Sequence, residues 1–395
     1  MSETLSTSVL LADGAEQRAW RAKLRGAGPV HRITTQSGET GWLIVGHEEA
    51  RNALVDLRLQ GRTATVGHGR RMPEDLERAL NSHMLNVGPP DHTRCTGWSR
   101  PRSPVGGSAD APADPELTDE LLDGLAGADE ADLVAGLALP LPMRVLVDLF
   151  GIPAEDCADF NVWTKVLTSA GAVDLDRLTT AAGEMVAYLR GLLDRKRQVP
   201  ESDLLSALVA VRDGADRLSD DELTSMVYLL LTAGYETTVN LIGNGLLNLL
   251  ANPEQLVAFK ADPDLLPQVV EEAMRFDSPV QIAVRHSTEP WEIAGQAIPS
   301  GALILVSLLW ANRDPDRFTE PEAFRVDRQD NPQLGFGYGF HHCIGAPLAR
   351  MEGTIAIGTV IRRFPALRLA HPAGSLTWRA SMVMHGLTAL PVHLR

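Results

Sequence analysis

Apolar residues recur at helical spacing along most of the chain, whereas runs of alternating or continuous β-branched residues are few. The strand-like runs are short and are bounded by Gly, Pro or charged residues. This distribution predicts a mainly α fold with a small β-rich lobe, an α+β architecture. The expected strands are residues 42–45, 291–294, 303–308 and 387–392, and the expected helices are residues 15–25, 48–55, 142–150, 177–197, 202–212 and 219–250.

A long, mostly apolar stretch, residues 223–250, is interrupted by a polar cluster at residues 233–238. Gly234 costs roughly 1 kcal/mol relative to Ala in a helix interior, and buried Glu236 and Thr237 need hydrogen-bond partners. We expect the helix to widen locally at this cluster, which would leave room for a small ligand and for water. The alternative is that Thr237 bonds back to a carbonyl of its own helix.

The loop at residues 337–346 places three glycines around Cys343 and leads into an expected helix at residues 347–352. Glycine permits positive φ and lets the backbone approach a flat group closely. Unpaired amide groups and the helix dipole would favour a thiolate at Cys343, which is the form that binds iron. The alternative is an ordinary buried cysteine.

The cysteine loop resembles the ligand loop of the cytochrome P450 family, the haem-thiolate monooxygenases. The family pattern Phe-Gly-x-Gly-x-His-x-Cys-x-Gly-x-x-Leu-Ala-Arg is matched at every fixed position of residues 336–350. The resemblance implies the cytochrome P450 fold, haem b (iron protoporphyrin IX) as the cofactor, and Cys343 as the iron ligand. The other loop residues that it assigns to the cofactor are Phe336 beside the ring, His341 at a propionate, and Gly337 and Gly345.

The same resemblance assigns the polar cluster of the long helix to the oxygen-binding side of the haem. Glu236 and Thr237 occupy the positions of an acid–alcohol pair that delivers protons during oxygen activation. Ala233 and Gly234 would contact the haem.

The segment Pro-Asp-His-Thr-Arg at residues 90–94 is typical of the bacterial soluble, actinomycete-type class of this family. In that class His92 would reach one haem propionate and Arg285 another, through charge-assisted hydrogen bonds. The following residues, 95–108, depart from the pattern: they are rich in Pro and Gly, and Thr96 stands where an arginine is expected. One hypothesis is a local reading-frame slip, which resequencing of codons 90 to 120 would decide; a genuine segment would affect haem retention.

Glu272 and Arg275 lie one helical turn apart, between the long helix and the cysteine loop in the sequence. The spacing is a weak signal by itself, but in the family this pair joins a downstream arginine, here matched by Arg328. The expected role is structural, because the three residues would hold the ligand loop. The resemblance also places the substrate wall on mostly apolar residues: Pro279, Val280, Ile282, Ala283, Met382 and Val383.

The chain has 395 residues, more than a single core usually holds, yet no linker or repeat divides it. We therefore expect one domain over residues 1–395. The apolar runs are shorter than a membrane span, the N-terminus lacks the pattern of a signal peptide, and three cysteines without paired spacing argue against a disulfide framework. A net charge of −15 argues against nucleic acid. These features predict a cytoplasmic monomer without membrane or nucleic-acid partners.

The resemblance implies a monooxygenase that hydroxylates or epoxidises a lipophilic small molecule in secondary metabolism, with polyketide or macrolide, terpenoid and peptide scaffolds as candidates. Electrons would come from NAD(P)H through a ferredoxin reductase and a ferredoxin, because the chain has no nucleotide fingerprint and no cluster cysteines. Three alternatives remain: another haem-thiolate reaction such as peroxygenation or oxidative coupling, a non-catalytic haem-binding protein, and a zinc site at His341, His342 and Cys343, whose adjacency suits tetrahedral geometry poorly.

Overall fold

The computed structural model describes residues 5–11, 14–35, 38–61, 72–96, 115–167, 174–212 and 218–395, so most of the aberrant segment at 95–108 lies outside the described residues. The chain forms two compact units. Unit 1 comprises residues 1–60, 115–140 and 237–395, and unit 2 comprises residues 61–114 and 141–236. The boundary falls within one helix, α11 (Asp220–Ala251). This division does not decide whether residues 1–395 act as a single domain, which stays a prediction.

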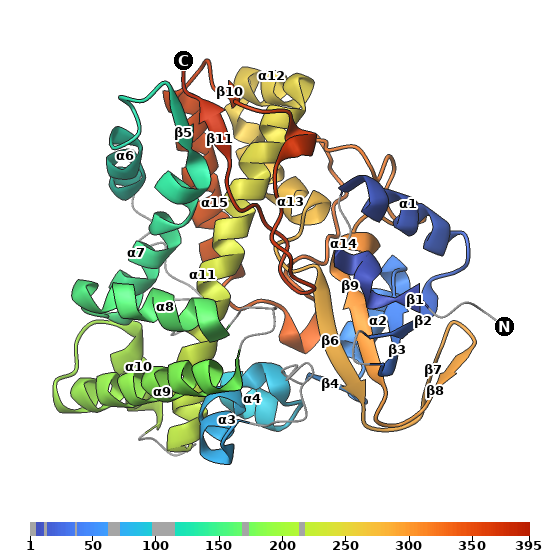
Figure 1. The fold of residues 1–395 in the computed structure, drawn as a ribbon, viewed down its shortest axis with the longest axis vertical. Coiled ribbons are helices and arrows are strands. Elements are labelled where there is room, and N and C mark those ends of the chain that lie inside the picture. The colour runs from blue at the N-terminus through green and yellow to red at the C-terminus, as the bar shows by residue number, and fades with distance from the viewer. Residues whose placement is uncertain are drawn as a thin grey trace. The chain divides into compact units, whose positions relative to one another are not determined.

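A six-stranded sheet in the order β1-β2-β3-β9-β6-β4 forms the main β structure of unit 1 (Figure 1). Its strand β9 (Leu303–Ser307) pairs in parallel with β3 (Thr40–Ile44) and antiparallel with β6 (Ile282–Ser287). All five residues of β9 are buried, as expected for an apolar run between two neighbouring strands. The remaining strands of this sheet are β1 (Leu5–Ser6), β2 (Val30–Thr34) and β4 (Leu59–Gly61).

Successive residues of β3 and β9 point to opposite faces of the sheet, so each strand contributes to two cores. Trp42 and Ile304 belong to the core that includes residues of α2 (His47–Val55). Leu43 and Leu305 belong to the second core, together with residues of α14 (Leu308–Ala311). Because both faces are covered, these strands read as apolar runs rather than as alternating ones.

Helices α13 (Leu266–Phe276) and α15 (Ala346–Arg363) pack against each other beside the second half of α11. A Cβ atom on Gly245 of α11 would lie 2.7 Å from Cδ1 of Ile357, so glycine permits this close packing. The other helices of unit 1 are α1 (Gly14–Arg25), α6 (Pro115–Asp123) and α12 (Pro253–Ala261). Two small sheets complete the unit: β10 (Arg368–Leu369), β11 (Pro391–His393) and β5 (Glu130–Asp132) form one, and β7 (Trp291–Ile293) and β8 (Gln296–Ile298) form the other.

Unit 2 is helical in its described part. Helix α9 (Leu175–Gln198) packs against α3 (Glu74–Asn81), α8 (Cys157–Leu167) and α10 (Leu204–Arg212). Its Lys196 is 5% exposed, and Nζ lies 2.5 Å from Oδ2 of Asp203, which offsets the cost of burying the ammonium group. The unit also contains α4 (Asp91–Thr96) and α7 (Pro140–Phe150), apart from Pro140.

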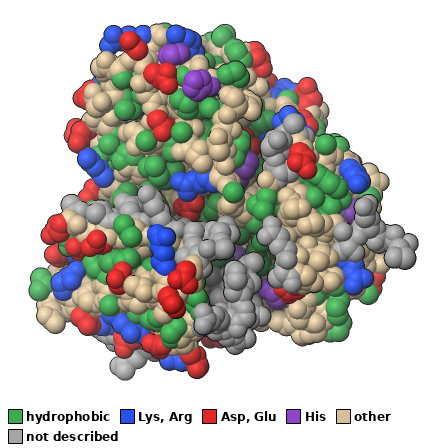
Figure 2. All heavy atoms as spheres, in the orientation of Figure 1, with side chains coloured by type: hydrophobic (Ala, Val, Ile, Leu, Met, Phe, Trp, Pro, Cys, Tyr) green, Lys and Arg blue, Asp and Glu red, His purple; other side chains and the backbone are tan. Residues whose placement is uncertain are grey.

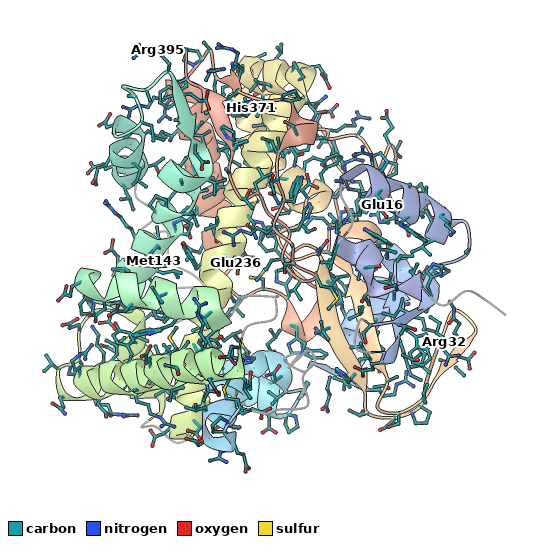
Figure 3. The ribbon with its side chains drawn as sticks, viewed as in Figure 1. Glu16, Arg32, Met143, Glu236, His371 and Arg395 are labelled. Atoms are coloured by element: carbon teal, nitrogen blue, oxygen red, sulfur yellow. The ribbon has the colours of Figure 1, made fainter. Side chains whose placement is uncertain are left out.

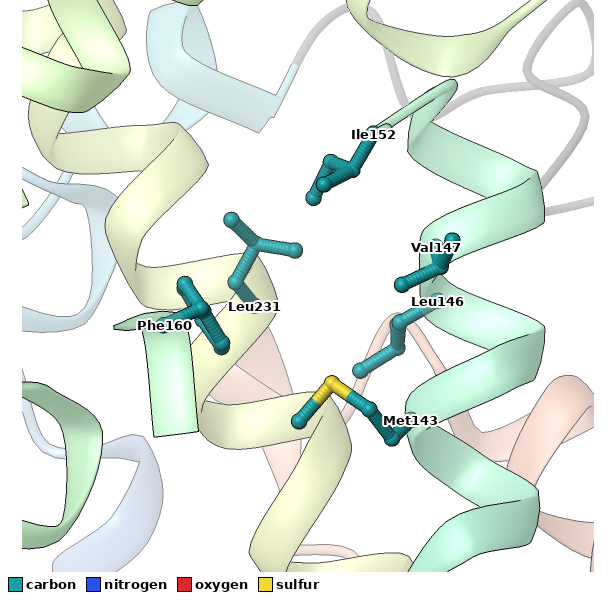
Figure 4. A pocket seen from close by; sticks show the side chains of 6 residues that line it. All are labelled: Met143, Leu146, Val147, Ile152, Phe160 and Leu231. Atoms are coloured by element: carbon teal, nitrogen blue, oxygen red, sulfur yellow. The ribbon is translucent and has the colours of Figure 1, made fainter. Parts of the chain in front are cut away.

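A small cavity lies among the helices of unit 2 (Figure 4). Its volume of about 10 Å³ is close to the minimum for one water molecule, and its lining carries no polar group that could hold one. The cavity is therefore a packing defect and too small for a substrate. Its lining residues are Met143, Leu146, Val147, Ile152, Phe160 and Leu231.

The predicted mainly α fold with a small β-rich lobe is confirmed. The predicted strand at 387–392 was wrong in extent, because only β11 forms a strand there, paired with β5 and β10, and Leu387 makes an isolated bridge with Trp378. Strands β2 and β6 were not predicted, since both carry Arg and His among their apolar residues and form strands through pairing with β3 and β9. The expected widening of the long helix is not observed, because α11 is α-helical from Asp220 to Ala251.

No helix in the described ranges is both long and apolar enough to cross a membrane. Acidic and basic side chains are interspersed over the face of the molecule that Figure 2 shows.

His83, which follows α3, gives unit 2 a predictable dependence on pH. The side chain is 3% exposed, and burial lowers its pKa from 6.5 to about 4. The unfolded chain therefore takes up a proton below about pH 6.5 that the folded chain does not accept until about pH 4, so stability is present above this window and is lost as pH falls through it. We expect His83 to lower the free energy of unfolding by about 2 kcal/mol between pH 7 and pH 5.

Urea titration of the protein and of His83→Leu at both pH values checks this expectation. The substitution removes the titrating group. The decrease in the free energy of unfolding between pH 7 and pH 5 should therefore be about 2 kcal/mol smaller in the variant than in the unmodified protein. Parallel losses in the two proteins would contradict a buried, neutral His83.

Candidate functional site

The cysteine loop of unit 1 is a tight turn closed by backbone hydrogen bonds. The Cys343 N–H donates to the Phe336 carbonyl at 2.8 Å, which joins the two ends of the loop. Gly337 and Gly339 have φ of 73° and 74°, so both need the freedom of glycine. Gly345 has φ of −84°, which other residues can also adopt. The loop ends at α15, whose first residue is Ala346.

The side chain of Cys343 is exposed, although protein atoms crowd its surroundings. This crowding raises the pKa of the thiol, while the N–H groups of Gly345 and Ala346 and the Arg350 guanidinium act to lower it. The two N–H groups at the start of α15 thus favour the thiolate as expected, but in the protein alone the crowding outweighs them and the pKa of the thiol is raised. The arrangement presents an accessible sulfur whose thiolate would be stabilised further by a bound cation.

The expected ionic group at residues 272, 275 and 328 is present, and its carboxylate is fully buried. Glu272 and Arg275 are both 0% exposed, and Oε1 of Glu272 accepts from Nη2 of Arg275 at 2.8 Å. Nε of Arg328 lies 3.0 Å from Oε2 of the same carboxylate. The Arg325 backbone N–H and the Asn331 side chain also donate to it. Four residues therefore donate to one carboxylate, which is the arrangement that a buried charge requires.

Asn312 links this ionic group to the cysteine loop. Nη1 of Arg275 donates to the Asn312 carbonyl at 2.9 Å, and the Asn312 side-chain oxygen accepts from the Leu334 N–H at 2.7 Å. Leu334 precedes Phe336 by two residues, and its carbonyl accepts from the Gly337 N–H at 2.8 Å. The ion pairs thus hold the first residues of the loop through three hydrogen bonds. Sequence reasoning missed Asn312, because a lone asparagine after an apolar run carries no distinguishing signal.

A second ion pair holds the far side of the loop. Nε of Arg350 on α15 lies 2.5 Å from Oε1 of Glu271, and the Arg350 guanidinium lies 4.4 Å from the centre of the Phe336 ring. Phe336 is 7% exposed. These contacts fix the orientation of the ring beside the cysteine. Sequence reasoning matched Arg350 to the family pattern but did not find Glu271 as its partner.

Arg285 on β6 is a buried cation without a buried counter-charge. It is 5% exposed, and no carboxylate among the described residues forms an ion pair with it. Its Nη1 donates to the neighbouring Val284 carbonyl at 2.9 Å. Burial lowers its pKa to about 10. A buried guanidinium of this kind suits an external carboxylate, with which it can form two hydrogen bonds.

Helix α11 changes its environment at the polar cluster. Residues 223–227 and 238–250 are buried, but Ala233 is exposed and Gly234 and Thr237 are half-buried. Glu236, labelled in Figure 3, is 9% exposed. The helix therefore borders accessible space at part of this polar cluster. Ala233, Gly234, Glu236 and Thr237 each have an interaction partner in the structure.

Of the two remaining predicted haem contacts, His341 lies in the cysteine loop and His92 lies in unit 2. His341 ends a short 3₁₀ turn, Gly339–His341, and its ring centre lies 4.5 Å from that of Phe340. His92 lies on α4 of unit 2, and burial lowers its pKa. Their expected contacts with a propionate stay predictions. Within the described ranges no three His, Cys, Asp or Glu side chains are grouped to hold a metal ion, so the zinc alternative has no ligand set there.

The structure brings together the two chain segments that were expected to line a substrate wall. The His385 N–H donates to the Pro279 carbonyl at 2.8 Å, and Val280 pairs with Met384 in an antiparallel bridge. Ile282 is 1% exposed and belongs to the sheet core, so the structure corrects its place in the wall. Pro279 is also buried. The wall candidates that keep accessible surface are the half-buried residues Val280, Ala283, Met382 and Val383.

Comparisons with known proteins agree on one family. A family model described as Cytochrome P450 matches residues 261–377. Cytochrome P450 107B1 of Saccharopolyspora erythraea is 43% identical over 92% of this chain and 92% of its own length. The cytochrome P450 monooxygenase PikC of Streptomyces venezuelae is 41% identical over 95% of this chain and 90% of its own. The tirandamycin C-bound P450 monooxygenase TamI has a similar structure, with a TM-score of 0.88 and 38% identity over 99% of this chain and 100% of that one.

Proposed function

Because this chain belongs to the cytochrome P450 family, we propose that Cys343 is the axial ligand of a haem b iron. The residues present fit this group. The Cys343 sulfur is accessible, two backbone N–H groups favour its thiolate, and Arg285 is a buried guanidinium that suits a propionate. The accessible thiol in a loop held from both ends is the observation that carries the proposal.

The protein is a monooxygenase, and its relatives include hydroxylases and epoxidases. When bound, the haem supplies the activation of O2, with one oxygen atom inserted into substrate and the other reduced to water. The chain supplies the surroundings of that reaction. The Cys343 thiolate would donate electron density to the bound haem, Arg285 and His341 would hold it through its propionates, and Phe336 would pack beside it.

We assign proton delivery to the polar cluster of α11. The Thr237 hydroxyl would hold a proton at Oγ1 toward the reacting centre, and the Glu236 carboxylate would bring protons from solvent. The exposed and half-buried positions at residues 233–237 support this assignment, because protons and a small ligand need accessible space beside the helix. Ala233 and Gly234 would leave that space free of large side chains.

Thr237→Ala should uncouple electron consumption from product formation. Loss of the hydroxyl removes the positioned proton donor, so we expect product formed per NAD(P)H to fall about tenfold while peroxide rises. Simultaneous assay of NAD(P)H, product and peroxide checks this expectation. Thr238→Ala, which removes a neighbouring hydroxyl from a buried position, serves as the control and should remain coupled. Tight coupling in Thr237→Ala would remove Thr237 from the relay.

The substrate class that we propose is a lipophilic secondary metabolite of the polyketide or macrolide type. Val280, Ala283, Met382 and Val383 present half-buried apolar surface, which suits such a molecule. The names of relatives support this class, since they include a 6-deoxyerythronolide B hydroxylase and a mycinamicin IV hydroxylase/epoxidase. The family requires redox partners, and we propose a ferredoxin with its NAD(P)H-dependent reductase.

A difference-spectrum screen of macrolides and other lipophilic metabolites tests the function directly. We expect members of this class to shift the haem spectrum and to be oxygenated when NAD(P)H, ferredoxin reductase and ferredoxin are supplied. Turnover that needs peroxide alone, or coupling of two substrate positions without oxygen insertion, would instead favour one of the other haem-thiolate reactions.

A further inference from the structure

The turn at residues 381–384, here called the wall turn, carries two of the proposed substrate contacts, Met382 and Val383. Its shape is set internally by Ser381, whose Oγ accepts from the N–H groups of Val383 at 3.3 Å and Met384 at 3.0 Å. These internal hydrogen bonds fix the conformation of the turn. Its position relative to the rest of unit 1 depends on contacts with residues outside the turn.

Gln281, the residue before strand β6, forms hydrogen bonds that hold the wall turn in place. Its side-chain Nε2 donates to the Ser381 carbonyl at 2.7 Å, and its backbone N–H donates to the Val383 carbonyl at 2.8 Å. Its own carbonyl accepts from the Leu308 N–H of α14 at 2.9 Å. Gln281 is 4% exposed, so its own polar groups are largely shielded from bulk water. One residue thus joins the wall turn, the strand segment and a core helix.

The base of the same segment is held separately. Nε2 of His385 lies 3.2 Å from Oδ1 of Asp277, and the His385 ring stacks on Trp378 with ring centres 4.2 Å apart. The Asn244 side chain donates to the His385 carbonyl at 3.0 Å. Because the base is held without Gln281 and the backbone bond to Val383 stays, loss of the Gln281 side chain would loosen the wall turn at Ser381 and leave the rest of the segment in place.

We propose that Gln281 is a positioning residue that fixes the depth of the wall turn and thereby sets affinity for bulky lipophilic ligands. The proposal rests on the proposed function, in which Met382 and Val383 face the substrate. Gln281 lies between two residues of the predicted wall but turns its side chain to the turn rather than to a ligand. A ligand that contacts the wall turn binds more tightly when the turn is already ordered. The affinity of a ligand that contacts the iron alone should not depend on the turn.

The test uses the full-length, haem-loaded protein and two substitutions of the same kind. Gln281→Met keeps the length of the side chain and removes its donor. Gln296→Met is the matched control, because Nε2 of Gln296 donates to the Val30 carbonyl at 2.5 Å, a bond of the same type on the strand β8. Spectral titrations with imidazole and with clotrimazole report a ligand that needs only the iron and one that fills the surrounding space.

Gln281→Met should weaken clotrimazole binding about three- to tenfold, which corresponds to the loss of one buried hydrogen bond. Imidazole should bind within about twofold of the unmodified protein, and Gln296→Met should change neither ligand. Equal changes for both ligands, or no change for clotrimazole, would overturn the proposal.

Hydrogen exchange gives a readout that does not depend on the haem. The amides of Val383 and Met384 should exchange faster in Gln281→Met than in Gln296→Met, and unchanged exchange would count against a positioning role. If imidazole fails to shift the spectrum of the unmodified protein, the haem assignment has failed, and the exchange rates alone then decide the role of Gln281.

Discussion

Cys343→Ser should abolish the thiolate signature of the CO-bound ferrous protein and reduce product formation to the background of the assay. A serine hydroxyl is a much poorer donor to iron than a thiolate, and it cannot supply the electron density on which O–O cleavage depends. The effect should be confined to the site, because Cys343 is exposed and its substitution opens no cavity in the core. Absorption spectra of the CO complex and turnover with a surrogate ferredoxin measure both quantities.

Cys95→Ala is the matched control for this substitution. Cys95 is 1% exposed on α4, so its replacement should reduce stability modestly while leaving the CO spectrum that of a thiolate complex. A retained thiolate signature in Cys343→Ser, or its loss in Cys95→Ala alone, would contradict the assignment of the iron ligand.

Glu272→Ala should cause the largest loss of stability of any single substitution considered. The carboxylate is 0% exposed and accepts from Arg275, from Arg328, from the Arg325 backbone and from Asn331, so its removal leaves two guanidinium groups with unpaired donors. Breaking a buried ion pair from one side costs about 3 to 5 kcal/mol. Because Asn312 joins this group to the start of the cysteine loop, haem retention should fall together with stability.

The neighbouring pair provides a control at almost the same position in the chain. Glu271 and Arg350 are 29% and 41% exposed at the side chain, so Glu271→Gln should cost less than about 1 kcal/mol. Denaturant midpoints and haem content of the two variants, measured side by side, check the difference. Similar losses for both would mean that burial of Glu272 does not carry the stabilisation.

Local features of the site could be predicted because each depends on a few neighbouring residues in the sequence. The glycines at 337 and 339 need positive φ wherever the loop turns tightly, and both adopt it. The interruption of an apolar helix by residues 233–238 marks a place where part of the helix surface is accessible, since Ala233 is exposed and Gly234 and Thr237 are half-buried. The helical widening expected there was wrong, since α11 accommodates the polar cluster by exposure and partnering without a break.

Other features depend on residues that are distant in the sequence. Glu272 is bound by groups more than fifty positions later, and Gln281 holds a turn a hundred positions away. Ile282 looked like a wall residue by position, but the pairing of β6 with β9 turns it into the core. No local pattern encodes such pairings, because they arise only when the chain folds back on itself.

By itself, the sequence of this protein determined the helical class, the glycine-rich turn around Cys343 and the polar interruption of the long helix, since periodicity and glycine geometry act over a few residues. Tertiary structure alone decided which way the pKa of the Cys343 thiol shifts, which side chains reach accessible space, and which residues hold the loop and the wall turn. The physical reason is that desolvation and long-range hydrogen bonds depend on what surrounds a group, and only the folded chain supplies those surroundings.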